Sequence, residues 1–143
     1  MRRNIILDTS VLVSLLSRQD NHHIWAKSTV DTISKPFFTC EAVLTETCFL
    51  LKSHNMGRKE VLRALQEGYI QIPFHLEDQA EAIELLMQRY QNVPMSLADA
   101  CLVRMSEMYE DSTILTLDSD FKIYRKNRNE SIPVIMPDLR SQL

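Results

Sequence analysis

The chain alternates between short apolar runs and longer segments with helical periodicity. The short runs have the length and composition of buried strands and cover residues 5–7, 36–39, 113–117 and 132–135. The longer segments carry an apolar stripe every three to four residues, which predicts helices over residues 10–16, 41–53, 58–67, 76–90 and 96–109. The stretch YIQIPF between two of these helices predicts a short extended link.

Strands that are separated by helices predict a parallel sheet covered on both faces. We therefore expect an α/β, three-layer fold with a short parallel sheet of four to five strands. Gly57 and Gly68 are the only glycines, which disfavours an all-β fold with many tight turns and excludes a glycine-rich phosphate loop. No repeat or linker interrupts the pattern, so we expect one domain over residues 1–143.

Composition narrows the class of protein. Hydrophobic residues make up 45% of the chain and charged residues 24%, which is typical of a globular protein and not of a disordered one. No apolar run reaches the roughly 20 residues needed to span a bilayer, so we expect a cytoplasmic protein without membrane contact. The cysteines Cys40, Cys48 and Cys101 lie in apolar settings, which predicts buried free thiols.

Two further observations limit the candidate chemistry. His22 and His23 are adjacent, so on a helix they cannot share one face, and no metal-binding spacing of Cys or His occurs; we expect no zinc site. The net charge of −3 argues against broad electrostatic binding of nucleic acid but leaves room for a local basic patch.

Acidic residues follow two of the predicted strands. Asp8 follows the first strand and Asp118 the strand near residue 115, and in open α/β sheets sites form outside the carboxyl ends of strands. Each acid also has a structural explanation. Asp8 could cap the following helix, although Thr9 and Ser10 could do the same, and Asp118 could bond its own backbone in a turn. Both interpretations stay open for each residue taken singly.

Glu46 lies on a predicted apolar stripe. We expect Val43, Thr47, Leu50 and Leu51 to face the core, and Glu46 falls between Val43 and Leu50 on that face. A carboxylate in such a position is costly unless it is paired, protonated or bound to a metal. The alternative is a position at the rim, where the side chain reaches water. On the same helix, Glu41 is predicted to face solvent.

Asp99 follows Ser96 by three residues, which is the spacing of a capping box that contributes about 1 kcal/mol to a helix start. Leu102 and Val103 follow Asp99 at three and four residues, so its face is also partly inward. Two strand ends, a core-facing helix position and a helix start would gather four carboxylates at one edge of the sheet. Such carboxylates repel one another, and a hard cation, Mg²⁺ or Mn²⁺, is the usual compensation. The arrangement suits phosphodiester hydrolysis.

The stretches LDTSVLVSLL, LTETCFLL, SLADACLV and TLDSDF, in this order and spacing, resemble the PIN-domain family, especially VapC-type toxin ribonucleases. The resemblance implies a PIN-like fold and a metal site formed by Asp8, Glu46, Asp99 and Asp118. It also implies supporting hydrogen bonds from Ser10 and Thr116. Asp120 would be an additional ligand or only a turn residue.

The resemblance further implies Mg²⁺- or Mn²⁺-dependent hydrolysis of single-stranded or structured RNA, with 5′-phosphate and 3′-hydroxyl products. Family members commonly form homodimers and are held by an antitoxin protein, and some process RNA without being toxins. The alternative from another functional class is a non-catalytic PIN-like module that binds RNA or protein.

The segment FKIYRKNRN is rich in basic residues and contains no acid. Its four cations are Lys122, Arg125, Lys126 and Arg128. Together with Tyr124 they suit a single-stranded nucleic acid, through phosphate contacts and stacking on bases. A solvated loop is the alternative explanation.

Overall fold

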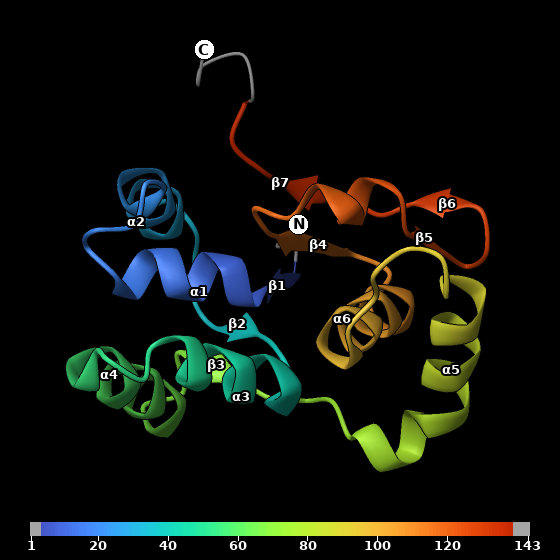
Figure 1. The fold of residues 1–143 in the computed structure, drawn as a ribbon, viewed down its shortest axis with the longest axis horizontal. Helices are drawn as coiled ribbons and strands as arrows, with labels where there is room; N and C mark the ends of the chain where they lie inside the picture. Colours follow the sequence, from blue (N-terminus) through green and yellow to red (C-terminus); the bar gives the residue numbers. More distant parts are fainter. Residues whose placement is uncertain (1–3, 139–143) are drawn as a thin grey trace.

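The computed structural model describes residues 4–138 and has the α/β architecture that the sequence predicts (Figure 1). Within these residues the main sheet has the strand order β3-β2-β1-β4-β7, and every neighbouring pair is parallel. Its strands are β1 (Asn4–Leu7), β2 (Phe37–Phe38), β3 (Ile70–Gln71), β4 (Ser112–Leu115) and β7 (Val134–Ile135). The predicted sheet of four to five strands is confirmed, with the YIQIPF stretch contributing β3.

The core of the sheet is built from short β-branched and leucine-rich strands. Ile6 of β1 and Ile114 and Leu115 of β4 are fully buried, as expected for a sheet with helices on both faces. β4 ends at Leu115, two residues before the predicted end, although the Thr116 N–H still donates to the Ile135 carbonyl. The predicted strand was too long because Leu117, although apolar, is only half-buried beyond the end of the sheet.

Helices flank the sheet on both sides. They are α1 (Thr9–Leu16), α2 (His23–Asp31), α3 (Glu41–Leu50), α4 (Asn55–Gln66), α5 (Leu76–Arg89) and α6 (Leu97–Met108). Figure 1 shows α1, α2 and α4 to the left of the strands and α5 and α6 to the right. α6 packs against β1 and β4, and α4 packs against β3.

The helix α2 is absent from the elements that the sequence predicts. Of its residues only Ala26 is fully buried, and Ile24, its most apolar side chain, is 81% exposed. A helix that buries so little surface lacks the apolar stripe by which helices are recognised in a sequence. Its packing against α1, a tertiary contact, is what the pattern cannot show.

The basic segment contains regular structure that the pattern of the sequence does not predict. After the short 3₁₀-helix η1 (Ser119–Lys122), β5 (Arg125–Lys126) pairs antiparallel with β6 (Glu130–Ser131). Asn127 and Arg128 at the turn have φ angles of 49° and 76°, the left-handed conformation of a tight hairpin turn. Three of the four predicted cations, Arg125, Lys126 and Arg128, are therefore part of a hairpin.

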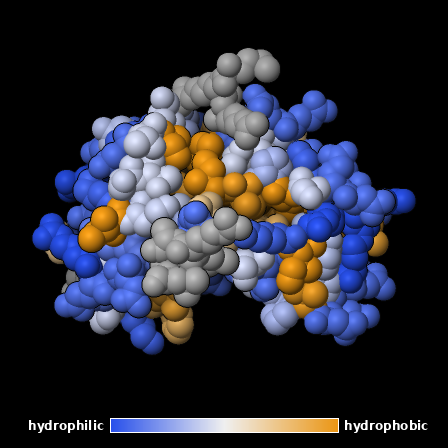
Figure 2. Space-filling view, turned by 90° about the horizontal axis from the view of Figure 1, so that it is seen from above, coloured by the Kyte–Doolittle hydropathy of each residue, from blue (hydrophilic) through white to orange (hydrophobic). Residues whose placement is uncertain are grey.

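The thiols and the surface agree with an ordinary globular protein. Cys40 and Cys101 are buried, Cys48 is half-buried, and all three are free. In Figure 2, hydrophilic residues cover both flanks and a hydrophobic band crosses the middle of the face on the β7 side. Over residues 4–138 no helix combines the length and apolar character needed to cross a bilayer.

Candidate active site

A cavity of about 300 Å³ lies where β1 and β4 end. The parallel register pairs Leu7 with Leu115, so the chain leaves both strands at the same edge of the sheet. The N-terminal ends of α1 and α6 and one face of α3 complete the walls. The four predicted acids all line this cavity: Asp8, Glu46, Asp99 and Asp118.

Asp8 both caps α1 and faces the cavity, so the two interpretations of this residue are compatible. Its Oδ1 accepts the Thr9 backbone N–H at 2.8 Å, which places it as the N-cap of α1. Its Oδ2 accepts the hydroxyls of Ser10 at 2.9 Å and Thr116 at 2.6 Å. The residue is 4% exposed. Three donors therefore hold one buried carboxylate in a single orientation.

Burial raises the pKa of Asp8 above its usual value, and the nearby Asp118 carboxylate adds to the increase. The hydrogen bonds from Thr116, Ser10 and Thr9 oppose this effect, because they stabilise the ionised form. Because the effect of burial is the larger one, a cation near Asp8 would stabilise the ionised form of its carboxylate.

Ser10 and Thr116 join the ends of β1 and β4. The Ser10 hydroxyl accepts the Leu117 N–H at 3.0 Å, and the Thr116 hydroxyl accepts the Asp118 N–H at 2.9 Å. Because both hydroxyls also donate to Asp8, they fix the position of Asp8 relative to the Asp118 backbone. Both side chains therefore act on the Asp8 carboxylate through direct hydrogen bonds.

Asp118 caps η1, and its Oδ1 accepts the Asp120 N–H at 2.9 Å. The Asp120 carbonyl in turn accepts the N–H groups of Ile123 and Tyr124. In the described part of the chain, Asp120 is not among the residues that line the cavity. Its contacts are those of a turn residue that orients Asp118.

Asp99 forms the predicted capping box at the start of α6: its side chain accepts the Ser96 N–H, and its own N–H donates to the Ser96 hydroxyl. Burial raises the pKa of Asp99 to about 6, with Asp8 and Asp118 adding to the increase. The Tyr124 hydroxyl lies 3.4 Å from Asp99 Oδ2 and 3.0 Å from the Pro94 carbonyl oxygen. Burial and the neighbouring carboxylates raise the Tyr124 pKa, so its hydroxyl stays protonated and can donate.

The predicted environment of Glu46 requires a correction. Val43, Thr47 and Leu51 are buried as predicted, but Glu46 is exposed and Leu50 is 52% exposed. The reason is that this edge of α3 borders the cavity, which both side chains line, and not the packed core. Glu46 thus occupies a rim position in which its carboxylate is open to water and to the other acids.

The acids of the cavity are the candidate ligands of a metal ion. Within residues 4–138, no three His, Cys, Asp or Glu side chains lie close enough together to enclose one. Asp8, Glu46, Asp99 and Asp118 offer oxygen ligands, which fit Mg²⁺ or Mn²⁺ with several retained waters better than zinc. Thr9 Oγ1, also in the cavity wall, is buried without a hydrogen-bond partner among the described residues.

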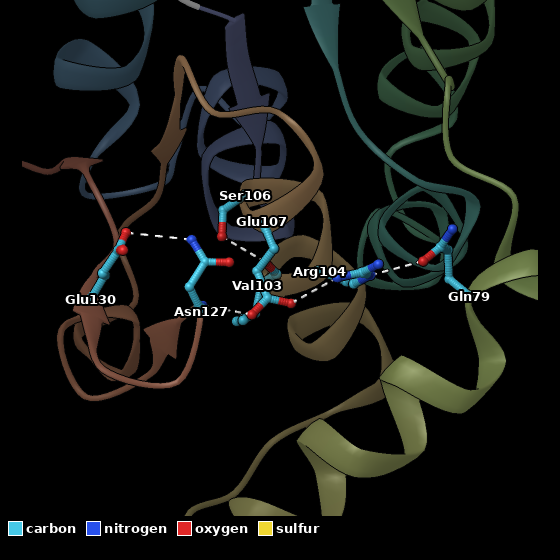
Figure 3. Close-up of polar contacts among 7 residues, drawn as sticks. All are labelled: Gln79, Val103, Arg104, Ser106, Glu107, Asn127 and Glu130. Carbon is cyan, nitrogen blue, oxygen red and sulfur yellow. Dashed lines mark hydrogen bonds and ion pairs between the residues drawn. The ribbon is translucent and has the colours of Figure 1, made fainter.

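The basic segment runs away from the cavity along α6. The Asn127 N–H donates to Glu107 near the C-terminal end of α6, and Figure 3 shows Asn127 lying between Glu107 and Glu130. Arg104 beside Glu107 also reaches Gln79 of α5 at 2.8 Å. The hairpin is therefore anchored at the end of α6 opposite to Asp99.

The four cations of this segment have different surroundings. Arg125 donates to the carbonyls of Lys122 and Tyr124, at 2.6 and 3.1 Å, and Lys126 is 9% exposed. Lys122 and Arg128 are exposed. Tyr124 is fully buried against Phe121 and Tyr90, so the expectation that it stacks on bases is wrong.

Three residues near the cavity are missed by sequence reasoning. Tyr124 contacts Asp99 from 25 residues away along the chain. Asp20 and His22 line the cavity from the loop between α1 and α2. Short polar loops carry no periodicity, so the pattern of the sequence contains no signal for this placement.

The comparisons with known proteins agree with this geometry. The sequence profile of the PIN domain matches residues 5–127. The crystal structure of Mycobacterium tuberculosis VapC20, described as a sarcin–ricin loop cleaving toxin, superposes with a TM-score of 0.76 at 20% identity. The match covers 84% of this chain and 94% of that chain. A search among curated proteins found no match. This chain therefore belongs to the PIN-domain family.

Proposed function

We propose that the protein is an endoribonuclease that uses Mg²⁺ or Mn²⁺ to hydrolyse phosphodiesters of RNA. The observation that carries the proposal is the convergence of Asp8, Glu46, Asp99 and Asp118 on one open cavity. These acids come from four separate elements, so no single local role accounts for all of them. A fold gains nothing in stability from crowding carboxylates, as the raised pKa values of Asp8 and Asp99 indicate.

The cavity suits the chemistry of phosphodiester hydrolysis. A bound Mg²⁺ or Mn²⁺ supplies a more acidic coordinated water and neutralises charge that develops on the phosphate. Asp8, Glu46, Asp99 and Asp118 would hold the ion.

Hydrogen bonds within the chain orient the acids of the cavity. Asp8 is fixed by three donors, Asp118 by the Asp120 N–H, and Asp99 by Ser96 and the Tyr124 hydroxyl. Hydrogen bonds of this kind to metal-binding carboxylates set ligand position and affinity. No Ser, Cys or His nucleophile is required.

Substrate and partners follow from the family. VapC20 is described as a toxin that cleaves the sarcin–ricin loop. We extend this to the present chain as a toxin of a toxin–antitoxin pair that acts in the cytoplasm as a homodimer. Its partners would be an antitoxin protein and single-stranded or structured RNA. Lys122 and Arg128 are the exposed cations of the basic segment and would contact the phosphates, while Arg125 holds the segment through its carbonyl contacts and Lys126 is buried.

The test is cleavage of a fluorescent single-stranded RNA and of a stem-loop RNA, with Mg²⁺, with Mn²⁺ and with EDTA. We expect metal-dependent cleavage that Asp8→Asn removes and that Asp78→Asn, a matched change at an exposed acid of α5, leaves intact. The alternative, a non-catalytic PIN-like module, predicts no cleavage and no binding of Mn²⁺ in a calorimetric titration.

A further inference from the structure

The cavity contains two side chains that the proposed metal site does not use. Asp20 and His22 line it from the loop between α1 and α2, with side chains 29% and 37% exposed. The loop is held in place by several contacts. Asp20 Oδ1 accepts the Ser14 hydroxyl at 2.8 Å and the His22 N–H at 2.9 Å. The Asp20 N–H donates to the Ser17 carbonyl. The position of His22 is thus set by bonds to α1.

The His22 ring faces Asp20 on one side only. His22 Nδ1 lies 3.9 Å from Asp20 Oδ1, while its Nε2 has no hydrogen-bond partner within residues 4–138. His22 is the N-cap residue of α2, but its side chain makes no capping bond. The ring therefore has no stabilising role in the helix that would explain its place.

His22 is also chemically distinct within the cavity. The five carboxylates that line it are Asp8, Asp20, Glu46, Asp99 and Asp118. Among the described residues, His22 is the one lining side chain with an N–H donor and the one that can carry positive charge. An RNA phosphate that enters a cavity of acids is repelled unless a cation or a donor meets it.

From this we infer that His22 contacts the RNA phosphate in the proposed reaction, with Nε2–H donating to a non-bridging phosphate oxygen. Asp20 acts as a positioning residue on the Nδ1 side of the ring: in the imidazolium form Nδ1–H faces the Asp20 carboxylate, and Nε2–H is left for the substrate. The inference rests on the proposed function, because it names a substrate contact in the same cavity.

The first arm of the test needs no catalysis. An oligouridylate is titrated into the full chain in Ca²⁺, and the ring signals of the four histidines are followed by NMR, with His→Ala variants for assignment. We expect the chemical shifts of the His22 ring to change with added RNA until binding is saturated. The signals of His75, which is exposed at the start of α5 and lines neither this cavity nor the one beside α2, should stay in place.

The second arm measures affinity. His22→Ala should weaken binding of the oligouridylate roughly 10-fold, as expected for one lost hydrogen bond to a charged group. His22→Gln keeps an N–H donor and should retain most of the affinity. Asp20→Asn should cause a smaller loss, His75→Ala none, and Mn²⁺ affinity should be equal in all variants. Thermal unfolding separates these effects from a loss of fold.

The outcomes separate the two proposals. Cleavage by the wild type with unmoved His22 signals, or with equal RNA affinity in His22→Ala, overturns the His22 contact and leaves the ribonuclease intact. Moving His22 signals without cleavage in any metal supports the contact and overturns the hydrolysis. A drop of Mn²⁺ affinity in His22→Ala would make the ring a metal ligand and so overturn the inference.

Discussion

The acid cavity and the basic segment 122–128 are both concentrations of charge, and both look functional as charge patterns. In the structure, the charged groups of the two regions differ in their contacts and exposure. In the cavity, hydroxyls and backbone N–H groups orient the carboxylates, which still face open space. In the basic segment, Arg125 donates to backbone carbonyls and Lys126 is buried. A charge run indicates a binding surface only where the fold leaves the charged groups free to bind.

The two regions also differ in the effect of their charges on the free energy of unfolding. Burial and mutual repulsion raise the pKa values of Asp8 and Asp99, so these acids are destabilising without a ligand. The contacts of Arg125 instead satisfy carbonyls at the end of η1 and help to close the turn before the hairpin. The cavity is thus the region where a bound cation is expected to increase the free energy of unfolding.

The largest expected effect is at the cavity. Asp8→Asn and Asp99→Asn should each reduce metal-dependent RNA cleavage by more than about 100-fold, since even groups that only support metal ligands contribute 10- to 100-fold. The folded state should persist, with an equal or higher Tm in EDTA, because like charge is removed. Cleavage assays and thermal melts measure both. Near wild-type cleavage in both variants would show that the cavity is not the active site.

The next effect tests the rim of the cavity with two acids of α3. Glu46→Gln should lower cleavage by at least about 10-fold, while Glu41→Gln, on an exposed face of the same helix, should leave it unchanged. The two variants remove the same charge from one helix, so a general electrostatic effect would change both equally. Equal losses would therefore remove Glu46 from the site.

A smaller effect is expected in the basic segment. If Lys122 and Arg128 contact phosphates, replacing both with Ala should flatten the slope of log K against log salt by about 0.7 per contact. Binding is measured in Ca²⁺ at several salt concentrations. Arg125→Ala is the matched comparison: it should lower Tm through its lost carbonyl contacts and leave the salt slope unchanged. Parallel salt lines for the Lys122 and Arg128 double variant would place the RNA path elsewhere.

The smallest effect concerns pH. Because the fold raises the pKa of Asp99 from 3.8 to about 6, the neutral form is favoured in the folded state. Its contribution to stability is present below the ordinary pKa and is lost as the pH rises through about 6. In EDTA, the wild type should therefore lose on the order of a few degrees of Tm relative to Asp99→Asn between about pH 4 and pH 7. A constant difference between the two Tm curves would contradict the raised pKa.

Much of the fold and of the candidate site follows from local pattern. Buried strands at residues 5–7 and 113–117 end in polar residues, and parallel strands present their carboxyl ends at one edge. The pattern therefore predicts that Asp8 and Asp118 lie at the same edge of the sheet. The capping box at Ser96 and Asp99 is a local motif as well, and it forms as predicted.

Local patterns do not predict contacts between residues that are far apart in the sequence. Thr116 and Asp8 meet although they are 108 residues apart along the chain, and only the known family pattern pointed to the pair. Tyr124 looks like a surface aromatic among cations, but the turn of η1 directs it inward to Asp99. Glu46 falls on an apolar stripe whose edge borders a cavity and not the core.

The sequence by itself determined the layers, the short parallel sheet and the gathering of acids, because hydrophobic periodicity and strand ends are local properties. Only the tertiary structure decided which charged groups remain available. It set Asp20 and His22 into the cavity wall and bound Arg125 to carbonyls, since these outcomes depend on how separate elements pack. Packing assigns each polar group either a partner within the protein or a place where a ligand must supply one.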